Sequence, residues 1–369
     1  MNQAIVRADG VTARAALDNH MTKSRGQLVA EVISGSWRAS PPALENSVEE
    51  LEEVLPLLLL SVSGVGALSW WKARHSSLRA SRQGFELQQK FRQHALHTAL
   101  HEQAIKHVIS LMHSAGVDPL LVKGWAVARL YPESGLRPYG DIDLCVSREQ
   151  YPRAVAAMNS PGGKGYWVDL HEGAAKLDDQ SFETLYARSQ VVKLDDVEVR
   201  VPGVEDHLRI LCVHLLRHGA WRPLWLCDVA ALLETRAADF DWGRCLGKDP
   251  RRADWIACAL GLAHQLLGAN VEGTPVEPRA RRLPHWLTAT VLEKWGEPYR
   301  HRVHMEVFLR HPVGMLREFR HHWPNPIEAT INMHAPFNNA PRLPFQIGDS
   351  IARAAKFISQ VPRLLRPQS

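Results

Sequence analysis

The sequence contains few cysteines, and their spacing fits neither a disulfide framework nor a zinc site. Five occur among 369 residues, with no C-x-x-C pair: Cys145, Cys212, Cys227, Cys245 and Cys258. An odd number cannot all pair within one chain, and structural zinc sites place cysteines only a few residues apart. This pattern favours a protein of a reducing compartment, and we expect a cytoplasmic location.

Long apolar runs are missing as well. Residues 1–30 hold no apolar block, so no secretory signal is expected. The most apolar stretch, residues 54–71, is interrupted by Pro56, Gly64 and Gly66. A membrane-spanning helix needs about 20 mostly apolar residues. We therefore predict a pair of buried helices in this stretch and no membrane span.

The chain also lacks a strong charge of one sign. Lys and Arg number 44 against 39 for Asp and Glu, which gives a formal net charge of +5. This mild excess attracts anions, but it does not by itself indicate a nucleic-acid partner. The basic residues 317–322 are most simply an exposed helix face, and RNA contact there is the less favoured alternative.

What the sequence does contain is a group of short apolar segments set among helical patterns. Residues 1–45 are polar and weakly patterned, and we expect a weakly ordered N-terminal segment there. Helical patterns fill residues 46–116 and 204–369, which we expect to form N- and C-terminal helical regions. Between them, residues 117–203 alternate apolar segments with turns and short helices. The predicted fold is α+β, with a small mixed sheet surrounded by helices.

Strands are expected at five places within residues 117–203. They lie at residues 119–123, 141–146, 166–171, 191–194 and 197–201. Between the last two, Asp195 and Asp196 are expected to form a hairpin turn.

Two acids stand at the start of the second expected strand. Asp141 and Asp143 are two residues apart, so in a strand their side chains project from the same face. Two carboxylates so near to each other repel unless a cation lies between them. Mg²⁺ commonly binds one or two carboxylates plus substrate phosphates. The spacing alone is weak evidence, because such pairs also occur in loops and helix caps.

A third acid, Asp169, lies within the apolar segment 166–170. An unpaired carboxylate is costly to bury there. Either it ends a strand in contact with solvent, or it completes a metal site. The acid pair expected on a neighbouring strand favours the metal site.

Around these acids the sequence resembles a known family. Residues 121–132 (LVKGWAVARLYP) and 137–144 (RPYGDIDL) resemble the uncharacterised nucleotidyltransferase family of the DNA polymerase beta superfamily. Residues 168–171, 211–219 and 225–233 share the resemblance, which covers roughly residues 57–233 and is strongest around Asp141 and Asp143.

The resemblance implies an activity and residue roles. It implies that residues 117–203 are a catalytic core that moves a nucleoside monophosphate from a nucleoside triphosphate, ATP by default, to a hydroxyl, releasing pyrophosphate. The acceptor could belong to a peptide, protein, sugar or small molecule. Asp141 and Asp143 are implied to bind two metal ions, and Asp169 the ion that activates the acceptor. Two cations about 4 Å apart stabilise both the attacking and the leaving oxygen. The expected metal is Mg²⁺, with Mn²⁺ as the alternative.

One departure from the superfamily concerns phosphate binding. The turn after the first strand usually reads Gly-Ser or Gly-Gly, whereas this chain has Gly124 followed by Trp125. We therefore predict that the triphosphate is held by Lys123 and Arg137, with Gly124 and Gly140 beside them. The alternative for both cations is a solvated surface position.

Three histidines and one further acid are weaker candidates. His214 and His218 are one helical turn apart and could hold a metal, with Asp228 orienting one ring. The favoured interpretation is that they are buried histidines joining two helices, because the spacing lacks the intervening Glu of a zinc-protease helix. His171, two residues after Asp169, is a candidate on the acceptor side.

Two other functions remain open. A glycosyltransferase also uses Asp-x-Asp to bind a metal and the diphosphate of a nucleotide sugar, but that mechanism has no role for Asp169. A non-catalytic nucleotidyltransferase-like binding protein is the other alternative, and the presence of all three acids argues against it.

Overall fold

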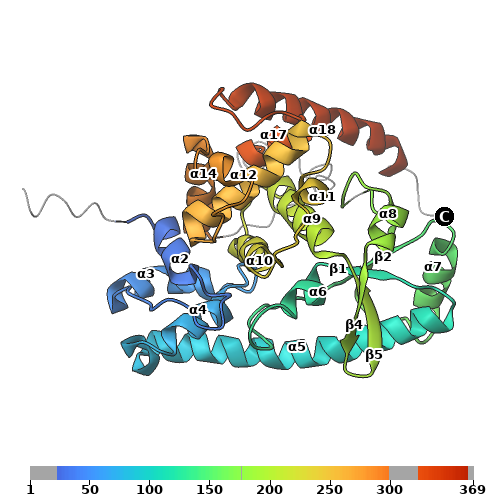
Figure 1. The fold of residues 1–369 in the computed structure, drawn as a ribbon, viewed down its shortest axis with the longest axis horizontal. Helices are drawn as coiled ribbons and strands as arrows, with labels where there is room; N and C mark the ends of the chain where they lie inside the picture. The colour runs from blue at the N-terminus through green and yellow to red at the C-terminus, as the bar shows by residue number, and fades with distance from the viewer. Residues whose placement is uncertain (1–22, 176, 299–322, 365–369) are drawn as a thin grey trace, which may run out of the picture.

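The computed structural model describes residues 23–175, 177–298 and 323–364 of the chain. Within this part, a five-stranded mixed sheet is surrounded by helices, which confirms the predicted α+β fold (Figure 1). The strands are β1 (Leu120–Val122), β2 (Ile142–Val146), β3 (Val168–Glu172), β4 (Gln190–Leu194) and β5 (Val197–Val201). Each of them falls on a segment that the sequence predicted to be a strand.

The helices lie before, between and after these strands. The N-terminal helices are α2 (Arg25–Ile33), α3 (Val48–Leu59), α4 (Gly66–Ala73), the 3₁₀ helix η1 (Ser77–Ala80) and α5 (Arg82–Ser114). Those among the strands are α6 (Gly124–Ala128), α7 (Tyr151–Asn159) and α8 (Phe182–Ala187). The C-terminal helices are α9 (Val204–Arg217), α10 (Pro223–Glu234), α11 (Trp242–Leu246), α12 (Pro250–Leu267), α13 (Glu277–Ala280), α14 (His285–Gly296), α17 (Pro326–Asn332) and α18 (Leu343–Leu364).

The strand order is β3-β2-β1-β5-β4, so β3 and β4 are the two edges of the sheet. β2 and β3 run parallel, whereas β1 and β2 run antiparallel with Val122 opposite Asp143. The end of β1 therefore lies beside the start of β2. β4 and β5 form the predicted hairpin, in which Asp195 takes a φ of 53°, as tight hairpin turns often require.

The two faces of the sheet pack against different helices. Side chains alternate along a strand, so Ile142 and Leu144 of β2 lie on one face, and Asp143 and Cys145 lie on the other. The first face packs against α5 and α7. On the second face, Cys145 packs with apolar side chains of α8 and α9. This second face carries the acids of the candidate site.

The N-terminal and C-terminal helices share one apolar core. Buried side chains of α2, α3 and α4 belong to the same cluster as those of α9, α10, α12 and α14. Residues 54–71 contribute the end of α3 and most of α4, both largely buried, as expected for this stretch. Among the described residues, no helix has the length and apolar character that crossing a membrane requires.

The first described helix differs from the sequence expectation of a weakly ordered segment. Helix α2 begins with a capping box between Ser24 and Gln27, and it buries Leu28, Val32 and Ile33. Nine residues are too few for a clear helical period, and tertiary packing supplies most of the stability of so short a helix. Residues 1–22 and the basic residues 317–322 lie outside the described part.

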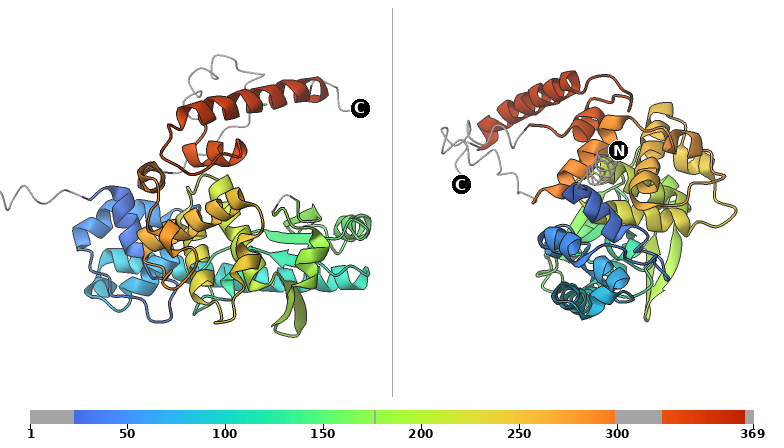
Figure 2. Two further views of the ribbon diagram at one scale, coloured as in Figure 1. Left: turned by 45° about the horizontal axis from the view of Figure 1, so that its top comes forward. Right: turned by 90° about the vertical axis from the view of Figure 1, so that its left-hand side faces the viewer.

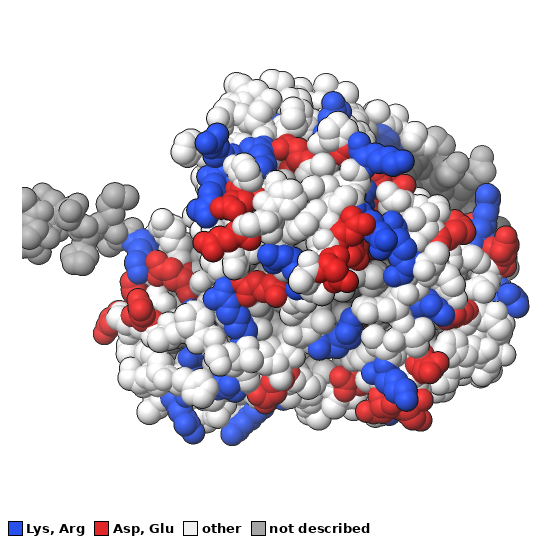
Figure 3. All heavy atoms as spheres, in the orientation of Figure 1, with Lys and Arg blue, Asp and Glu red and all other residues white. Residues whose placement is uncertain are grey.

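Two long helices bound the molecule. Helix α5 runs along one side, beneath both the N-terminal helices and the sheet, and α18 lies on the opposite side (Figures 1 and 2). On the face shown in Figure 3, Lys and Arg side chains are interspersed with Asp and Glu side chains. That face therefore presents no continuous basic surface of the kind that binds nucleic acid.

Candidate metal and nucleotide site

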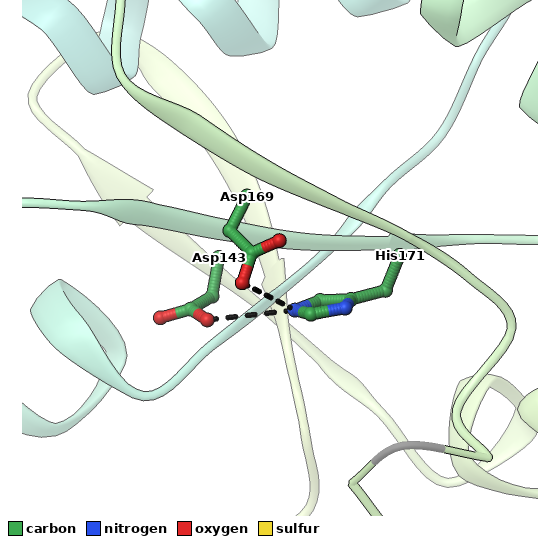
Figure 4. Close-up of side chains that lie close together, drawn as sticks. All are labelled: Asp143, Asp169 and His171. Atoms are coloured by element: carbon green, nitrogen blue, oxygen red, sulfur yellow. Dashed lines mark ion pairs between the residues drawn. The ribbon is translucent and has the colours of Figure 1, made fainter. Parts of the chain in front are cut away.

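Strand register brings two acids and a histidine together. In the parallel pair of β2 and β3, Asp143 lies opposite Asp169, and Cys145 lies opposite His171. Asp169 and His171 are two residues apart, so all three side chains project from one face of the sheet. One potential ligand atom from each lies within 4.8 Å of the other two. Figure 4 shows the imidazole pointing between the two carboxylates.

The ring of His171 is buried and makes no hydrogen bond among the described residues. Its Nε2 lies 3.5 Å from Asp143 Oδ1 and 3.3 Å from Asp169 Oδ2. Ordinary N–H···O hydrogen bonds measure about 2.7 to 3.2 Å, so these are longer, electrostatic contacts. Neither ring nitrogen has a hydrogen-bond partner, although only 7% of the residue is exposed. A buried polar group without a partner costs about 1 to 3 kcal/mol.

The two carboxylates differ in their access to solvent. Asp143 is on an inner strand and is 3% exposed, whereas the side chain of Asp169, on the edge strand β3, is 56% exposed. A ligand from solution can therefore reach the cluster from the Asp169 side.

A lysine neutralises the buried carboxylate. Lys123 directly follows β1, and its Nζ lies 2.6 Å from Asp143 Oδ1. Burial alone would raise the pKa of Asp143, but the neighbouring His171 and the Lys123 ammonium together hold that pKa below its ordinary value. Asp143 is therefore an anion at neutral pH. Lys123 takes a φ of 56°, a conformation that is uncommon and strained for a residue with a side chain.

The structure does not place Asp141 in this cluster. It is exposed and precedes Ile142, the first residue of β2, so strand alternation does not fix its side chain. Its charge acts on Arg137 and Arg222. A role for Asp141 as a metal ligand stays a prediction.

The two glycines of the predicted phosphate site leave space near Asp141. Gly124 has a φ of 36°, and a Cβ added there would lie 3.5 Å from the Asp141 carbonyl oxygen. A Cβ added to Gly140 would meet no atom within 4 Å. Phosphate contact at either glycine also stays a prediction.

Arg137 forms an ion pair with Asp228. Its Nε and Nη2 donate to the two carboxylate oxygens of Asp228 at 3.1 and 2.7 Å, and Tyr131 donates to Asp228 Oδ1 at 2.9 Å. All three side chains are buried. Asp228 thus occupies the bidentate fork that the sequence assigned to phosphate, and binding of phosphate by Arg137 stays a prediction.

His214 and His218 pack as an aromatic cluster with Trp225, but His218 is exposed, so the expectation that both rings are buried is wrong for His218. Their ring centroids are 4.5 Å apart, and the His214 ring lies 4.6 Å from that of Trp225. Burial, together with the charge of Lys123, holds the pKa of His214 well below its ordinary value, so the ring is neutral. The one metal-type cluster found among the described residues contains neither histidine.

Arg222 is a residue that the sequence analysis missed. It directly precedes α10 and is mostly buried, and burial together with the charge of Arg137 lowers its pKa to about 10. Arg222, Lys123 and Arg137 all act electrostatically on His214, so they form one cationic region. A single arginine carries no sequence pattern, and only the fold reveals this grouping.

Comparison with known proteins identifies a family for the part of the chain that carries the cluster. Residues 61–268 match a family model described as an uncharacterised nucleotidyltransferase. The match spans β1, β2 and β3 and therefore includes the cluster of Asp143, Asp169 and His171. No curated protein and no solved structure matches the chain.

Proposed function

Because the chain belongs to the family of uncharacterised nucleotidyltransferases, we propose that it transfers a nucleoside monophosphate from a nucleoside triphosphate to a hydroxyl group. ATP is the default donor. The observation that carries the proposal is the pair Asp143 and Asp169, held opposite each other by the register of β2 and β3. In the reaction, the acceptor oxygen bonds to the α-phosphorus, the bond from that phosphorus to the α–β bridging oxygen breaks, pyrophosphate leaves, and the hydroxyl proton passes to solvent.

The cluster fits a divalent cation. It offers two carboxylates and a buried imidazole whose nitrogens have no hydrogen-bond partner. Asp143 and Asp169 would hold Mg²⁺ or Mn²⁺, with Asp141 as a further ligand, together with triphosphate oxygens. When bound, such a cation stabilises negative charge on the attacking and leaving oxygens.

The cationic region beside the cluster would bind the triphosphate. Lys123 neutralises Asp143 in the structure, and its long side chain can turn to a phosphate oxygen when a metal takes its place. Arg222 adds a second cation whose Nε has no hydrogen-bond partner among the described residues. Gly140 is exposed with open space beside it, whereas Gly124 is buried, so phosphate would reach the backbone more readily at Gly140.

The acceptor would approach from the edge of the sheet. The exposed side chain of Asp169 is the part of the cluster that faces solvent. This opening sets no narrow limit on acceptor size, and a hydroxyl of a peptide, protein, sugar or small molecule remains the proposed class. The proposed location is the cytoplasm, since all five cysteines are free and buried.

The glycosyltransferase alternative is less well supported. It assigns no function to Asp169. In this fold, however, the carboxylates of Asp143 and Asp169 both contact the Nε2 atom of His171. A non-catalytic binding protein is the other alternative, and the transfer assay decides between it and an enzyme.

The test is to incubate the pure protein with each common nucleoside triphosphate, labelled in the α-phosphate, with Mg²⁺ or Mn²⁺ and with or without cell extract. Transfer of label to an acceptor supports the proposal and identifies donor and acceptor class together. Triphosphate binding without any transfer would indicate a binding protein. Transfer from a labelled nucleotide sugar instead would indicate a glycosyltransferase.

A further inference from the structure

We propose that His171 is a metal ligand, so that the site prefers a first-row transition-metal ion such as Mn²⁺ to Mg²⁺. This inference rests on the proposed function, since it concerns the metal of the same site. It goes further in assigning a nitrogen donor to a centre that would otherwise consist of carboxylates alone.

His171 Nε2 lies 3.3 and 3.5 Å from one oxygen of each carboxylate. Ligand atoms bound about 2.1 Å from one ion lie about 3 to 3.5 Å apart. The separations of His171 Nε2 from the two carboxylates therefore suit ligands of a common ion, and the three donor atoms all lie within 4.8 Å of one another. The register of the parallel strands β2 and β3 fixes the relative positions of these three residues.

Both nitrogens of His171 are buried without a hydrogen-bond partner, and Nε2 points between two carboxylates (Figure 4). A ring hydrogen-bonded to either acid would stand closer to it, at about 2.7 to 3.2 Å. A cation between the three donor atoms satisfies Nε2 and both carboxylates together.

A nitrogen donor changes which ion is preferred. Mg²⁺ takes oxygen ligands and keeps much of its water, whereas imidazole suits transition metals such as zinc, iron and nickel. Mn²⁺ accepts carboxylate and water ligands and also serves as a magnetic probe of any nitrogen bound to it. We expect the protein to bind Mn²⁺ about tenfold or more tightly than Mg²⁺.

The test is pulsed electron paramagnetic resonance of Mn²⁺ bound to the full-length protein with inorganic tripolyphosphate. Tripolyphosphate supplies phosphate oxygens and contains no nitrogen, so any nitrogen coupling comes from the protein. The expected result is a nitrogen coupling that is lost in His171→Ala. It should persist in His97→Ala, a matched control whose histidine is exposed on α5.

Two further samples keep the test decisive. Parent protein made with histidine of the heavy nitrogen isotope should show a changed coupling, and this needs no variant to fold. His171→Asp should retain Mn²⁺ binding without nitrogen coupling, and its ratio of Mn²⁺ to Mg²⁺ affinity should fall by about tenfold.

The outcomes separate this inference from the proposed function. Mn²⁺ that binds the parent but not Asp143→Asn, with no nitrogen coupling, would overturn the inference and leave the transferase proposal standing. A coupling that survives His171→Ala would overturn it as well. Absence of any Asp143-dependent ion binding would overturn the inference together with the metal site of the proposed function.

Discussion

The ammonium nitrogen of Lys123 lies 2.6 Å from Asp143 Oδ1, so a buried ion pair engages the carboxylate that the proposed metal requires. The Lys123 side chain is 15% exposed and that of Asp143 is 4% exposed. The proposed metal would therefore compete with the lysine for one anion, and its binding would free the lysine for the triphosphate.

Lys123→Met should therefore change two affinities in opposite directions. The Mn²⁺ affinity should rise by about tenfold because a competing cation is removed. The triphosphate affinity should fall by about tenfold to a hundredfold, as expected for the loss of a charge-assisted bond of about 1.5 to 3 kcal/mol. Calorimetric titration measures both, and Lys193→Met, at an exposed position on β4, is the control. A parallel fall in both affinities would contradict this exchange.

Substitution of Asp143 and of Asp169 should impair different steps of the reaction. Asp143→Asn should lose both metal binding and transfer. The buried Asp143 carboxylate contacts Lys123 and His171, and it is the carboxylate that the proposed metal requires. Asp169→Asn should still bind triphosphate yet lose turnover, because the metal that Asp169 is proposed to hold serves the acceptor hydroxyl. Asp196→Asn, in the exposed hairpin turn, should behave like the parent. Equal loss of triphosphate affinity in both variants would place Asp169 on the donor side instead.

Arg137 is predicted to act mainly on stability. Arg137→Ala leaves Asp228 buried without its bidentate partner, and breaking a buried pair costs about 3 to 5 kcal/mol in the free energy of unfolding. Arg137→Lys should recover little of this loss, since lysine lacks the planar fork. Urea unfolding measures the effect, with the exposed pair of Arg148 and Glu172 as the control site. A stable Arg137→Ala protein that binds triphosphate weakly would show instead that Arg137 acts as a phosphate ligand.

Arg222 is predicted to act on binding. Its mostly buried guanidinium has no hydrogen-bond partner at Nε among the described residues. Arg222→Ala should therefore weaken triphosphate binding by about tenfold or more without a comparable loss of stability. Calorimetric titration with inorganic tripolyphosphate checks this without any contribution from the base. Unchanged affinity would exclude Arg222 from the triphosphate site.

Acid should destabilise the protein through His207. Burial, with the charges of Arg129 and Arg137, lowers the pKa of His207 from 6.5 to about 3. Between these two values the unfolded chain binds a proton that the folded chain does not, so stability falls as the pH drops. The loss is about 2 kcal/mol between about pH 7 and about pH 4.5.

The check for His207 is urea unfolding at both pH values for the parent and for His207→Leu. The variant should lose less stability on acidification by that amount, whatever its stability at neutral pH. Equal losses in the two proteins would show that His207 is not the group that titrates.

The strands of the sheet and the acids on them can be predicted from local patterns, because apolar segments and turn residues determine where short strands begin and end. Residues 166–171 predicted the strand that carries Asp169, and β3 lies at Val168–Glu172. Asp143 and Asp169 then become neighbours once β2 and β3 pair in parallel. The direction of the Asp141 side chain does not follow from the sequence pattern. Strand β2 begins one residue after Asp141, so the alternation of side chains along a strand does not apply to it.

Partners distant in sequence could not be predicted from local patterns. Arg137 and Asp228 are 91 residues apart, and only the packing of α10 beside the loop before β2 pairs them. The grouping of Arg222 with Lys123 depends on tertiary packing in the same way. His171 was recognised only as a neighbour of Asp169, since its contact with Asp143 depends on strand register.

Asp143 is proposed to take part in transferring a nucleoside monophosphate. The decisive experiment compares the parent and Asp143→Asn with a donor labelled in the α-phosphate and, separately, in the γ-phosphate. The parent should move only the α-label to the acceptor, with an equal amount of pyrophosphate released, and Asp143→Asn should move neither. Transfer of the γ-label, or α-label transfer that persists in Asp143→Asn, would contradict this proposal.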